Sequence, residues 1–287
     1  MTSTTRKESV STFYRPIQGV TVTHIKQMYD LYASFYENTS LDVFLHDLSK
    51  KSGVILLTRK SDDQVVGFST LTTFDLTVDG RRIRGIFSGD TIIEPAYWGN
   101  NALATTFQRR VLIERFKHPL TPFYWFLISK GYKTYLLLTN NFYNYYPNVN
   151  GGDERYRRVT EAYCEALFPE AFDRKRMLLD FGNEYVCLKG DVAEITPELK
   201  AANPHIAFFE KINPEWRRGT EVPCVGSLDY ESVLRSCIDM PLKWVRKHLL
   251  KTHRPAGLDL TSTTRTGASP WPDTDVMHDT LDRQRAS

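Results

Sequence analysis

The sequence predicts an α/β fold of the α+β kind, in which a mixed, mostly antiparallel sheet is flanked by helices and a helical extension follows. Three observations support this prediction. Two stretches with apolar residues at three-to-four spacing are followed by three short runs rich in Val, Ile and Thr, and then by alternating helical and strand patterns. Short polar turns separate the three runs, so we expect these strands to pair antiparallel.

Two amphipathic helices begin the patterned part of the chain. The spacing of Ile25, Met28 and Tyr32 predicts a helix over residues 22–37. Ser40 is placed to cap a second helix directly afterwards.

Three strands come next, with predicted ranges 53–59, 64–73 and 82–94. The Asp79-Gly80 pair is typical of a tight turn between the second and third strands. Gly85 and Gly89 lie inside the third strand, and glycine there indicates a bulge or a close approach of backbone.

Periodicity and turn residues also predict the later elements. Helices are expected at 102–116, 131–138, 155–167, 206–212 and 230–251, and strands at 123–128, 177–180 and 184–189. The expected organisation is a disordered stretch at 1–12, a main domain at 13–190, an extension packed on it at 191–252 and a disordered tail at 253–287.

Composition excludes several kinds of protein. The chain has 37 basic and 34 acidic side chains, a balance too even for a typical nucleic-acid-binding domain. No signal-peptide pattern and no apolar run of about 20 residues is present, so we expect a cytoplasmic protein without a membrane span. The spacing of cysteine and histidine fits neither a disulfide framework nor a metal site, so no metal is expected.

A glycine-containing loop, Ile93 to Leu103 (IEPAYWGNNAL), lies between the third strand and the next helix. Backbone N–H groups and the positive end of the helix dipole at such a helix start can bind a pyrophosphate. The order of elements from Val22 to Leu138, together with this loop, resembles the GNAT-type N-acyltransferase superfamily. The resemblance implies a thioester donor lodged where two neighbouring strands part.

The loop departs from the superfamily pattern at three positions. Trp98 stands where the pattern has Arg or Gln, Asn101 where it has Gly, and Leu103 where it has Gly or Ala. Asn100 and Asn101 tolerate a left-handed backbone and can support a tight turn. Two interpretations remain open: either Trp98 and Leu103 favour a longer acyl chain or an acyl-carrier donor over acetyl-CoA, or donor binding has been lost. The residues that the resemblance assigns to the donor are Ile92, Ile93, Trp98, Gly99, Asn100, Asn101, Ala102 and Leu103.

Acyl transfer to an amine needs a group that takes the amine proton and a group that protonates the leaving thiolate. Asp90 is the candidate base: it lies near the end of the third strand, in period two with Ile86 and Ile92, where apolar surroundings raise the pKa of a carboxyl. The alternative is that Asp90 caps a bulge or pairs with an arginine. By resemblance, a tyrosine of the helix at 131–138 protonates the thiolate, with Tyr135 preferred over Tyr132; the alternative for each is core packing.

The predicted function is therefore acyl transfer from a CoA or acyl-carrier phosphopantetheine thioester to an amine of a small molecule or peptide. The alternative is a catalytically inactive GNAT-like module that binds an acylated ligand or partner protein. His205 and Glu210 are candidates for an acceptor pocket, without an assigned role. The basic residues of stretch 230–251 indicate a solvated helix, or a surface that docks an acidic carrier protein or a membrane surface.

Overall fold

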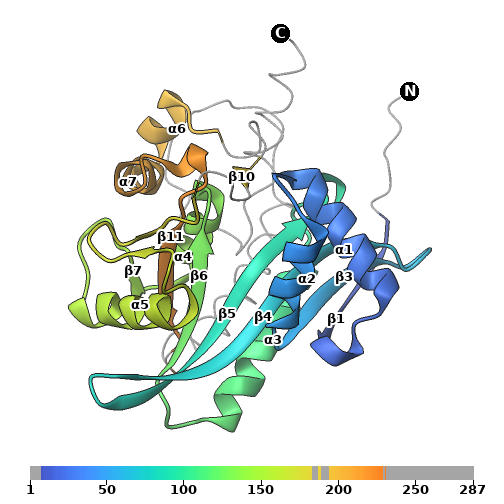
Figure 1. Ribbon diagram of the computed structural model, residues 1–287, viewed down its shortest axis with the longest axis horizontal. Helices are drawn as coiled ribbons and strands as arrows, with labels where there is room; N and C mark the ends of the chain where they lie inside the picture. The colour runs from blue at the N-terminus through green and yellow to red at the C-terminus, as the bar shows by residue number, and fades with distance from the viewer. Residues whose placement is uncertain (1–7, 183–186, 189–193, 229, 231–287) are drawn as a thin grey trace, which may run out of the picture.

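A computed structural model describes residues 8–182, 187–188, 194–228 and 230 (Figure 1). Among these residues a central sheet of seven strands has the order β1-β3-β4-β5-β6-β11-β7. Its strands are β1 Val10–Pro16, β3 Gly53–Arg59, β4 Val65–Val78, β5 Arg81–Ile93, β6 Phe123–Ser129, β7 Tyr145–Tyr146 and β11 Val222–Ser227. β5 and β6 run parallel and the other neighbours pair antiparallel, which confirms the predicted mixed, mostly antiparallel sheet.

Helices cover both faces of this sheet (Figure 1). One face carries α1 Val22–Phe35, α2 Leu41–Ser49 and α5 Glu154–Leu167, and the other carries α3 Ala102–Lys117 and α4 Tyr132–Asn141. Side chains of β3 alternate between the two cores: Val54 and Leu56 pack under α1 and α2, while Ile55 and Leu57 belong to the core under α3 and α4. This strand is buried on both faces, which explains its continuous apolar run.

Smaller elements complete the described part of the chain. They are η1 Ile17–Gly19, β2 Tyr36–Glu37, η2 Pro95–Tyr97, β8 Phe172–Asp173, β9 Leu178–Leu179, β10 Cys187–Leu188, α6 Pro197–Ala202, α7 Pro204–Ile212 and η3 Trp216–Arg218. β10 pairs with β2 and β8 pairs with β9, while α7 packs on α4.

The structure differs from the sequence prediction at both ends of the sheet. Val10 to Thr12 were expected to be disordered, yet they pair with residues 57–59 as the start of β1. Residues 222–227 were assigned to an extension packed on the domain, without a predicted strand, yet they form β11 inside the sheet between β6 and β7. The predicted helix at 230–251 and the predicted tail at 253–287 lie outside the described residues, Tyr230 excepted.

A β-bulge interrupts β5 at Gly89, one of the two glycines that indicated a bulge or a close approach. Thr70 of β4 lies alone opposite Gly89 and Asp90, because the register shifts between Ser69 and Leu71. The extra residue bends β5 and reverses the alternation of its side chains beyond that point.

Candidate functional site

β5 and β6 part immediately before the bulge. Their parallel pairing runs from Arg84 opposite Phe123 to Ser88 opposite Leu127, after which β5 continues to Ile93 beside β4 alone. Figure 1 shows the two strands diverging beyond their paired segment. The end of β5 therefore has one edge that β6 does not cover.

The backbone of Ile93 faces that uncovered edge. The N–H of Glu94 donates to the carbonyl oxygen of Val66 on β4 at 2.9 Å. Backbone groups alternate in direction along an antiparallel strand, so those of Ile93 point away from β4. Thr91, two residues earlier, has the same orientation, and together these two residues offer hydrogen-bonding groups to an extended ligand beside β5.

Trp98 occupies part of the same edge. Its indole Nε1–H donates to the carbonyl oxygen of Ile93 at 2.7 Å. The Nζ of Lys133, in the first turn of α4, lies 5.7 Å from the centroid of the Trp98 ring. Because α4 follows β6, the half-buried Trp98 side chain connects the end of β5 with the segment that follows β6.

The loop turns at Gly99 and not at the asparagines expected to do so. Gly99 has φ 76°, whereas Asn101, the residue before α3, has φ −83°. Asn100 instead makes a local hydrogen bond, in which its Oδ1 accepts the N–H of Ala102 at 2.8 Å. In the first turn of a helix the N–H groups lack intrahelical acceptors, so the amides of Leu103 and Ala104 remain for an anionic ligand.

Three of the residues assigned to the donor send their side chains into the hydrophobic core. Leu103 is 2% exposed and belongs, with Ile93, to the core under α3 and α4. Ile92 packs into the core under α1 and α2. Leu103 therefore does not obstruct the loop, and these three residues can contact a ligand through backbone only.

Asp90 lies on the face covered by α1 and α2. The Asp90 side chain was expected, from its period-two spacing, to share one face of the sheet with both Ile86 and Ile92. That expectation was wrong, because the bulge places the two isoleucines in opposite cores. Within the described part of the chain, the Asp90 carboxylate makes no hydrogen bond or ion pair. Burial raises its pKa to about 6, against the opposing positive charge of Lys51.

Six side chains surround Asp90 and are called here the Asp90 group. They are Tyr32, Tyr36, Asp47, Lys51, Lys130 and Glu221, all linked electrostatically to Asp90 directly or through one another. They include two ion pairs, Lys51–Asp47 at 2.8 Å and Lys130–Glu221 at 3.4 Å. These residues were not predicted from the sequence, because they come from four distant segments and match no local motif.

Aromatic rings complete this group. The Tyr32 and Tyr36 ring centroids lie 4.8 Å apart, and the Nζ of Lys130 lies 5.2 Å from the Tyr36 centroid. The Nζ of Lys51 lies 5.5 Å from the centroid of Phe87. Carboxylates and aromatic faces around Asp90 thus hold the two ammonium groups of Lys51 and Lys130. The same kinds of contact bind a protonated amine ligand.

The two candidate tyrosines differ in their surroundings. Tyr135 is fully buried, and its hydroxyl donates to the carbonyl oxygen of Pro147 at 2.9 Å, within an aromatic cluster that includes Phe208 and Phe209. This placement matches the core-packing alternative. Tyr132 is the first residue of α4 and half-buried, and burial raises its pKa, so its hydroxyl keeps its proton at neutral pH.

His205 and Glu210 do not form a joint polar pocket. The His205 ring lies 6.5 Å from the Tyr135 ring, and burial lowers its pKa, which favours the neutral imidazole. Glu210 pairs with Lys200 of α6 at 2.7 Å. His205 thus belongs to the packing of α7 against α4, and Glu210 to the contact between α6 and α7.

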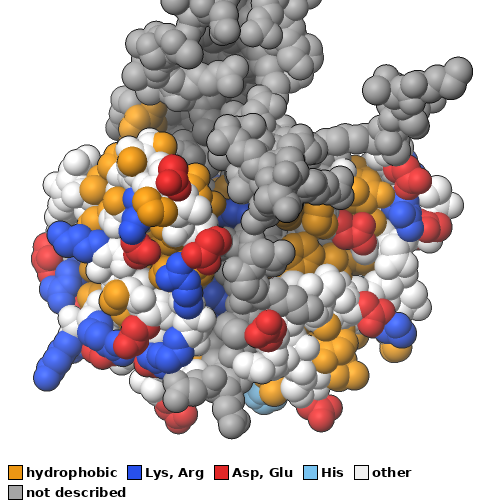
Figure 2. Space-filling view, turned by 90° about the horizontal axis from the view of Figure 1, so that it is seen from above, with side chains coloured by type: hydrophobic (Ala, Val, Ile, Leu, Met, Phe, Trp, Pro, Cys, Tyr) orange, Lys and Arg blue, Asp and Glu red, His pale blue; other side chains and the backbone are white. Residues whose placement is uncertain are grey.

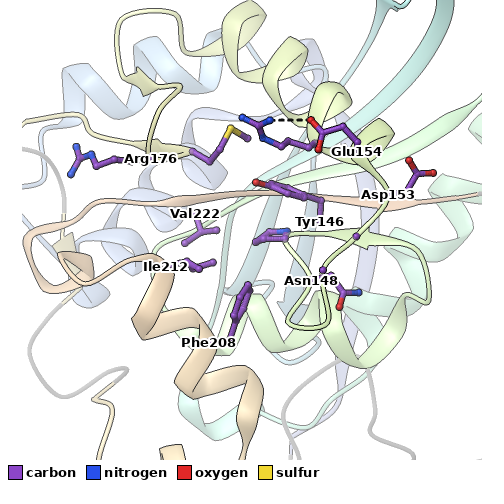
Figure 3. A pocket seen from close by; sticks show the side chains of 13 residues that line it. Tyr146, Asn148, Asp153, Glu154, Arg176, Phe208, Ile212 and Val222 are labelled. Atoms are coloured by element: carbon purple, nitrogen blue, oxygen red, sulfur yellow. Dashed lines mark hydrogen bonds and ion pairs between the residues drawn. The ribbon is translucent and has the colours of Figure 1, made fainter.

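A separate cavity of about 280 Å³ lies between the β7–α5 loop, α7 and β11 (Figure 3). Its lining includes Tyr146, Arg157, Met177 and Phe208, but none of the predicted site residues. Arg157 is held there by Glu154 at 2.9 Å and by Glu161 at 3.1 Å. The cavity is therefore distinct from Asp90 and from the loop before α3.

The surface differs between the two halves of the molecule. Figure 2 shows Lys and Arg side chains gathered on the half that carries α5 to α7, and exposed hydrophobic side chains on the half that carries α1 and α2. Among the described residues, no helix is long and apolar enough to cross a membrane. The same residues contain no cluster of three or more His, Cys, Asp or Glu that could hold a metal ion.

Comparisons with known proteins gave structural likeness only. No protein-family model and no curated protein matches the sequence. A probable N-acyltransferase from Enterococcus faecalis is similar over 47% of this chain and 33% of its own length, with 16% identity and a TM-score of 0.36. This chain thus spans about a third of that protein.

Two further structures are similar over a comparable share of the chain. Arabidopsis thaliana NAA60, solved with a bisubstrate analogue, matches 41% of this chain and 74% of its own, with 8% identity and a TM-score of 0.32. The Escherichia coli GNAT-family protein YhbS, solved with CoA, matches 42% and 64%, with 12% identity and a TM-score of 0.31. These likenesses are partial and assign no family to this chain. What the structure shows is the predicted mixed, mostly antiparallel sheet flanked by helices, with β5 and β6 parting beyond their paired segment.

Proposed function

We propose that this protein is an N-acyltransferase that moves an acyl group from a CoA or acyl-carrier thioester to an amine of a small molecule or peptide. The observation that carries the proposal is the position of Asp90. A carboxyl with no partner among the described residues, and with a pKa raised to about 6, lies just beyond the point where β5 and β6 part. A carboxyl with this pKa is ionised at neutral pH and can accept a proton.

The open edge of β5 suits an extended thioester donor. A phosphopantetheine arm carries two secondary amides, which can pair with strand backbone as an added strand does. The outward-facing groups of Thr91 and Ile93 offer such pairing. The amides of Leu103 and Ala104 at the start of α3 suit the phosphates of the same donor.

The surroundings of Asp90 suit an amine acceptor. Asp90 provides negative charge for an ammonium, and the neighbouring Tyr32 ring provides an aromatic face for a cation–π contact. In the proposed reaction, Asp90 takes a proton from the amine, and the amine nitrogen attacks the thioester carbonyl. The new C–N bond forms as the C–S bond breaks, and the thiolate receives a proton from Tyr132 or from water.

Turnover with defined substrates tests this proposal. The full chain is incubated with CoA and phosphopantetheine thioesters of increasing acyl length, each combined with a set of primary amines and short peptides. Free thiol and product mass are then followed together. The proposal requires one thiol released for each N-acylated product, and release of neither across the whole set would refute it.

The inactive-module alternative makes a different prediction. If the module only binds an acylated ligand, CoA thioesters will bind without releasing thiol at any amine concentration. Binding by calorimetry beside the turnover assay separates the two functions.

A further inference from the structure

Trp98 contacts the segment of β5 to which the donor is proposed to bind. The Nε1–H of its indole lies 2.7 Å from the outward-facing carbonyl oxygen of Ile93. The register with β4 leaves this oxygen without a ladder partner, because Glu94 makes the hydrogen bond to Val66. Trp98 thus satisfies the acceptor as the amide N–H of an extended ligand would.

The backbone of the loop around Trp98 positions the indole beside the Ile93 carbonyl oxygen. Trp98 follows η2, and the left-handed Gly99 turns the chain toward α3 immediately afterwards. On the other side, Lys133 of α4 faces the ring at 5.7 Å. The indole therefore lies between the end of β5 and the start of α4, where β6 no longer covers β5.

From this arrangement we propose that Trp98 is a donor-selecting residue, because its indole N–H competes with a thioester donor for the Ile93 carbonyl and must leave it when the donor arm binds. This inference rests on the proposed function. It adds that an acceptable donor has an amide N–H able to replace the indole N–H at Ile93. It also implies that the free protein binds the arm more weakly than the same protein without the indole N–H.

The test compares two ligands and two substitutions in the full chain. Trp98→Phe keeps an aromatic ring and removes the N–H. Trp216→Phe is the matched control, because the Nε1 of Trp216 is buried without a hydrogen-bond partner among the described residues. Calorimetry measures the binding of CoA, which has the arm, and of adenosine 3′,5′-bisphosphate, which lacks it. Since one hydrogen bond contributes about 1 kcal/mol, Trp98→Phe is expected to tighten CoA binding roughly 3- to 10-fold.

The expected pattern is specific. Trp98→Phe leaves the affinity for adenosine 3′,5′-bisphosphate unchanged, and Trp216→Phe changes neither affinity. In a ¹⁵N-labelled protein, the indole resonance that Trp98→Phe removes shifts when CoA is added, because its hydrogen bond to Ile93 is lost.

The outcomes separate this inference from the proposed function. CoA binding that weakens or stays unchanged in Trp98→Phe overturns the competition, while the proposed acyl transfer stands. An equal gain for both ligands also overturns it, because the indole would then obstruct the phosphates and not the arm. If neither wild type nor variant binds CoA, this inference falls and CoA is excluded as the donor, and the turnover assay with phosphopantetheine thioesters decides the proposed function separately.

Discussion

Thr70 and Gly89 approach each other so closely across the β4–β5 ladder that a Cβ at residue 89 would lie 2.5 Å from the Thr70 Oγ1. Only glycine fits there without a shift of the Thr70 side chain or of the strand. The bulge that this contact permits sets the direction of the next residue, Asp90. The chemistry proposed for Asp90 thus depends on the missing side chain of its neighbour.

Gly89→Ala is expected to lower both stability and rate. The added methyl group must push Thr70 or the bulge aside, which costs roughly 1–3 kcal/mol of the free energy of unfolding. Denaturant unfolding and kcat measure the two effects. Gly19→Ala is the control, because a Cβ there comes no nearer than 3.9 Å to another atom. Equal stability of the two variants would contradict the close contact at residue 89.

Asp90→Asn is expected to slow transfer roughly 10²- to 10⁴-fold without weakening the affinity for CoA, because a proton acceptor is removed while the donor contacts remain. Steady-state kinetics and calorimetry check the two parts. Asp30→Asn serves as a surface control, since Asp30 forms an exposed pair with Lys26 on α1. An unchanged kcat in Asp90→Asn would remove Asp90 from the role of base.

The pH dependence of the reaction should report the same group. Only the ionised Asp90 accepts a proton, so kcat/KM should fall about tenfold per pH unit below a pKa near 6. Rates measured from about pH 4.5 to about pH 8 reveal this acid limb. Persistence of the same limb in Asp90→Asn would assign it to another residue.

Stability should depend on the same ionisation in the opposite sense. The Asp90 pKa is raised from 3.8 to about 6 in the folded chain, so ionisation costs folding free energy. That cost is absent below pH 3.8, grows as the pH rises through 6 and is complete above it. Because Asp90 is partly exposed, solvent screening reduces this cost. Asp90→Asn should therefore stabilise the protein by roughly 1–2 kcal/mol at about pH 8 and by little at about pH 4. Denaturant unfolding at both pH values measures the difference, and an equal effect at the two would contradict the raised pKa.

The two candidate tyrosines should respond differently to loss of the hydroxyl. Tyr135→Phe leaves the buried carbonyl of Pro147 without its partner, so it should cost about 1 kcal/mol of stability while kcat changes less than about twofold. Tyr132→Phe should lower kcat if its hydroxyl protonates the thiolate. The two kcat values, measured beside thermal unfolding, decide between them. A slow but stable Tyr135→Phe would restore Tyr135 as the proton donor.

Much of the fold follows from local patterns in the sequence. The run Gly53–Arg59 was predicted with its observed limits, because a strand buried on both faces is apolar throughout and bounded by polar turns. The helix that follows the loop was predicted from Ala102, the residue at which α3 begins. Gly89 indicated the bulge, since glycine inside a strand often permits close backbone approach.

The remainder depends on contacts between distant segments. β11 lies between β6 and β7 in the sheet, although residues 147–221 separate it from β7 along the chain. No local pattern in the sequence indicates that insertion. A bulge can be suspected from Gly89, but its effect on the faces of Ile86 and Ile92 requires the actual register. The Asp90 group and the hydrogen bond from Trp98 to Ile93 likewise appear only once the chain is folded.

A structure of the protein with a CoA thioether, whose sulfur linkage resists transfer, would show where the donor binds. We expect the arm to lie along the edge of β5 that β6 does not cover, with an amide N–H on the Ile93 carbonyl, the indole of Trp98 displaced, and the acyl end beside Asp90. An arm bound elsewhere, for example in the cavity between the β7–α5 loop, α7 and β11, would refute this binding mode and the role proposed for Asp90.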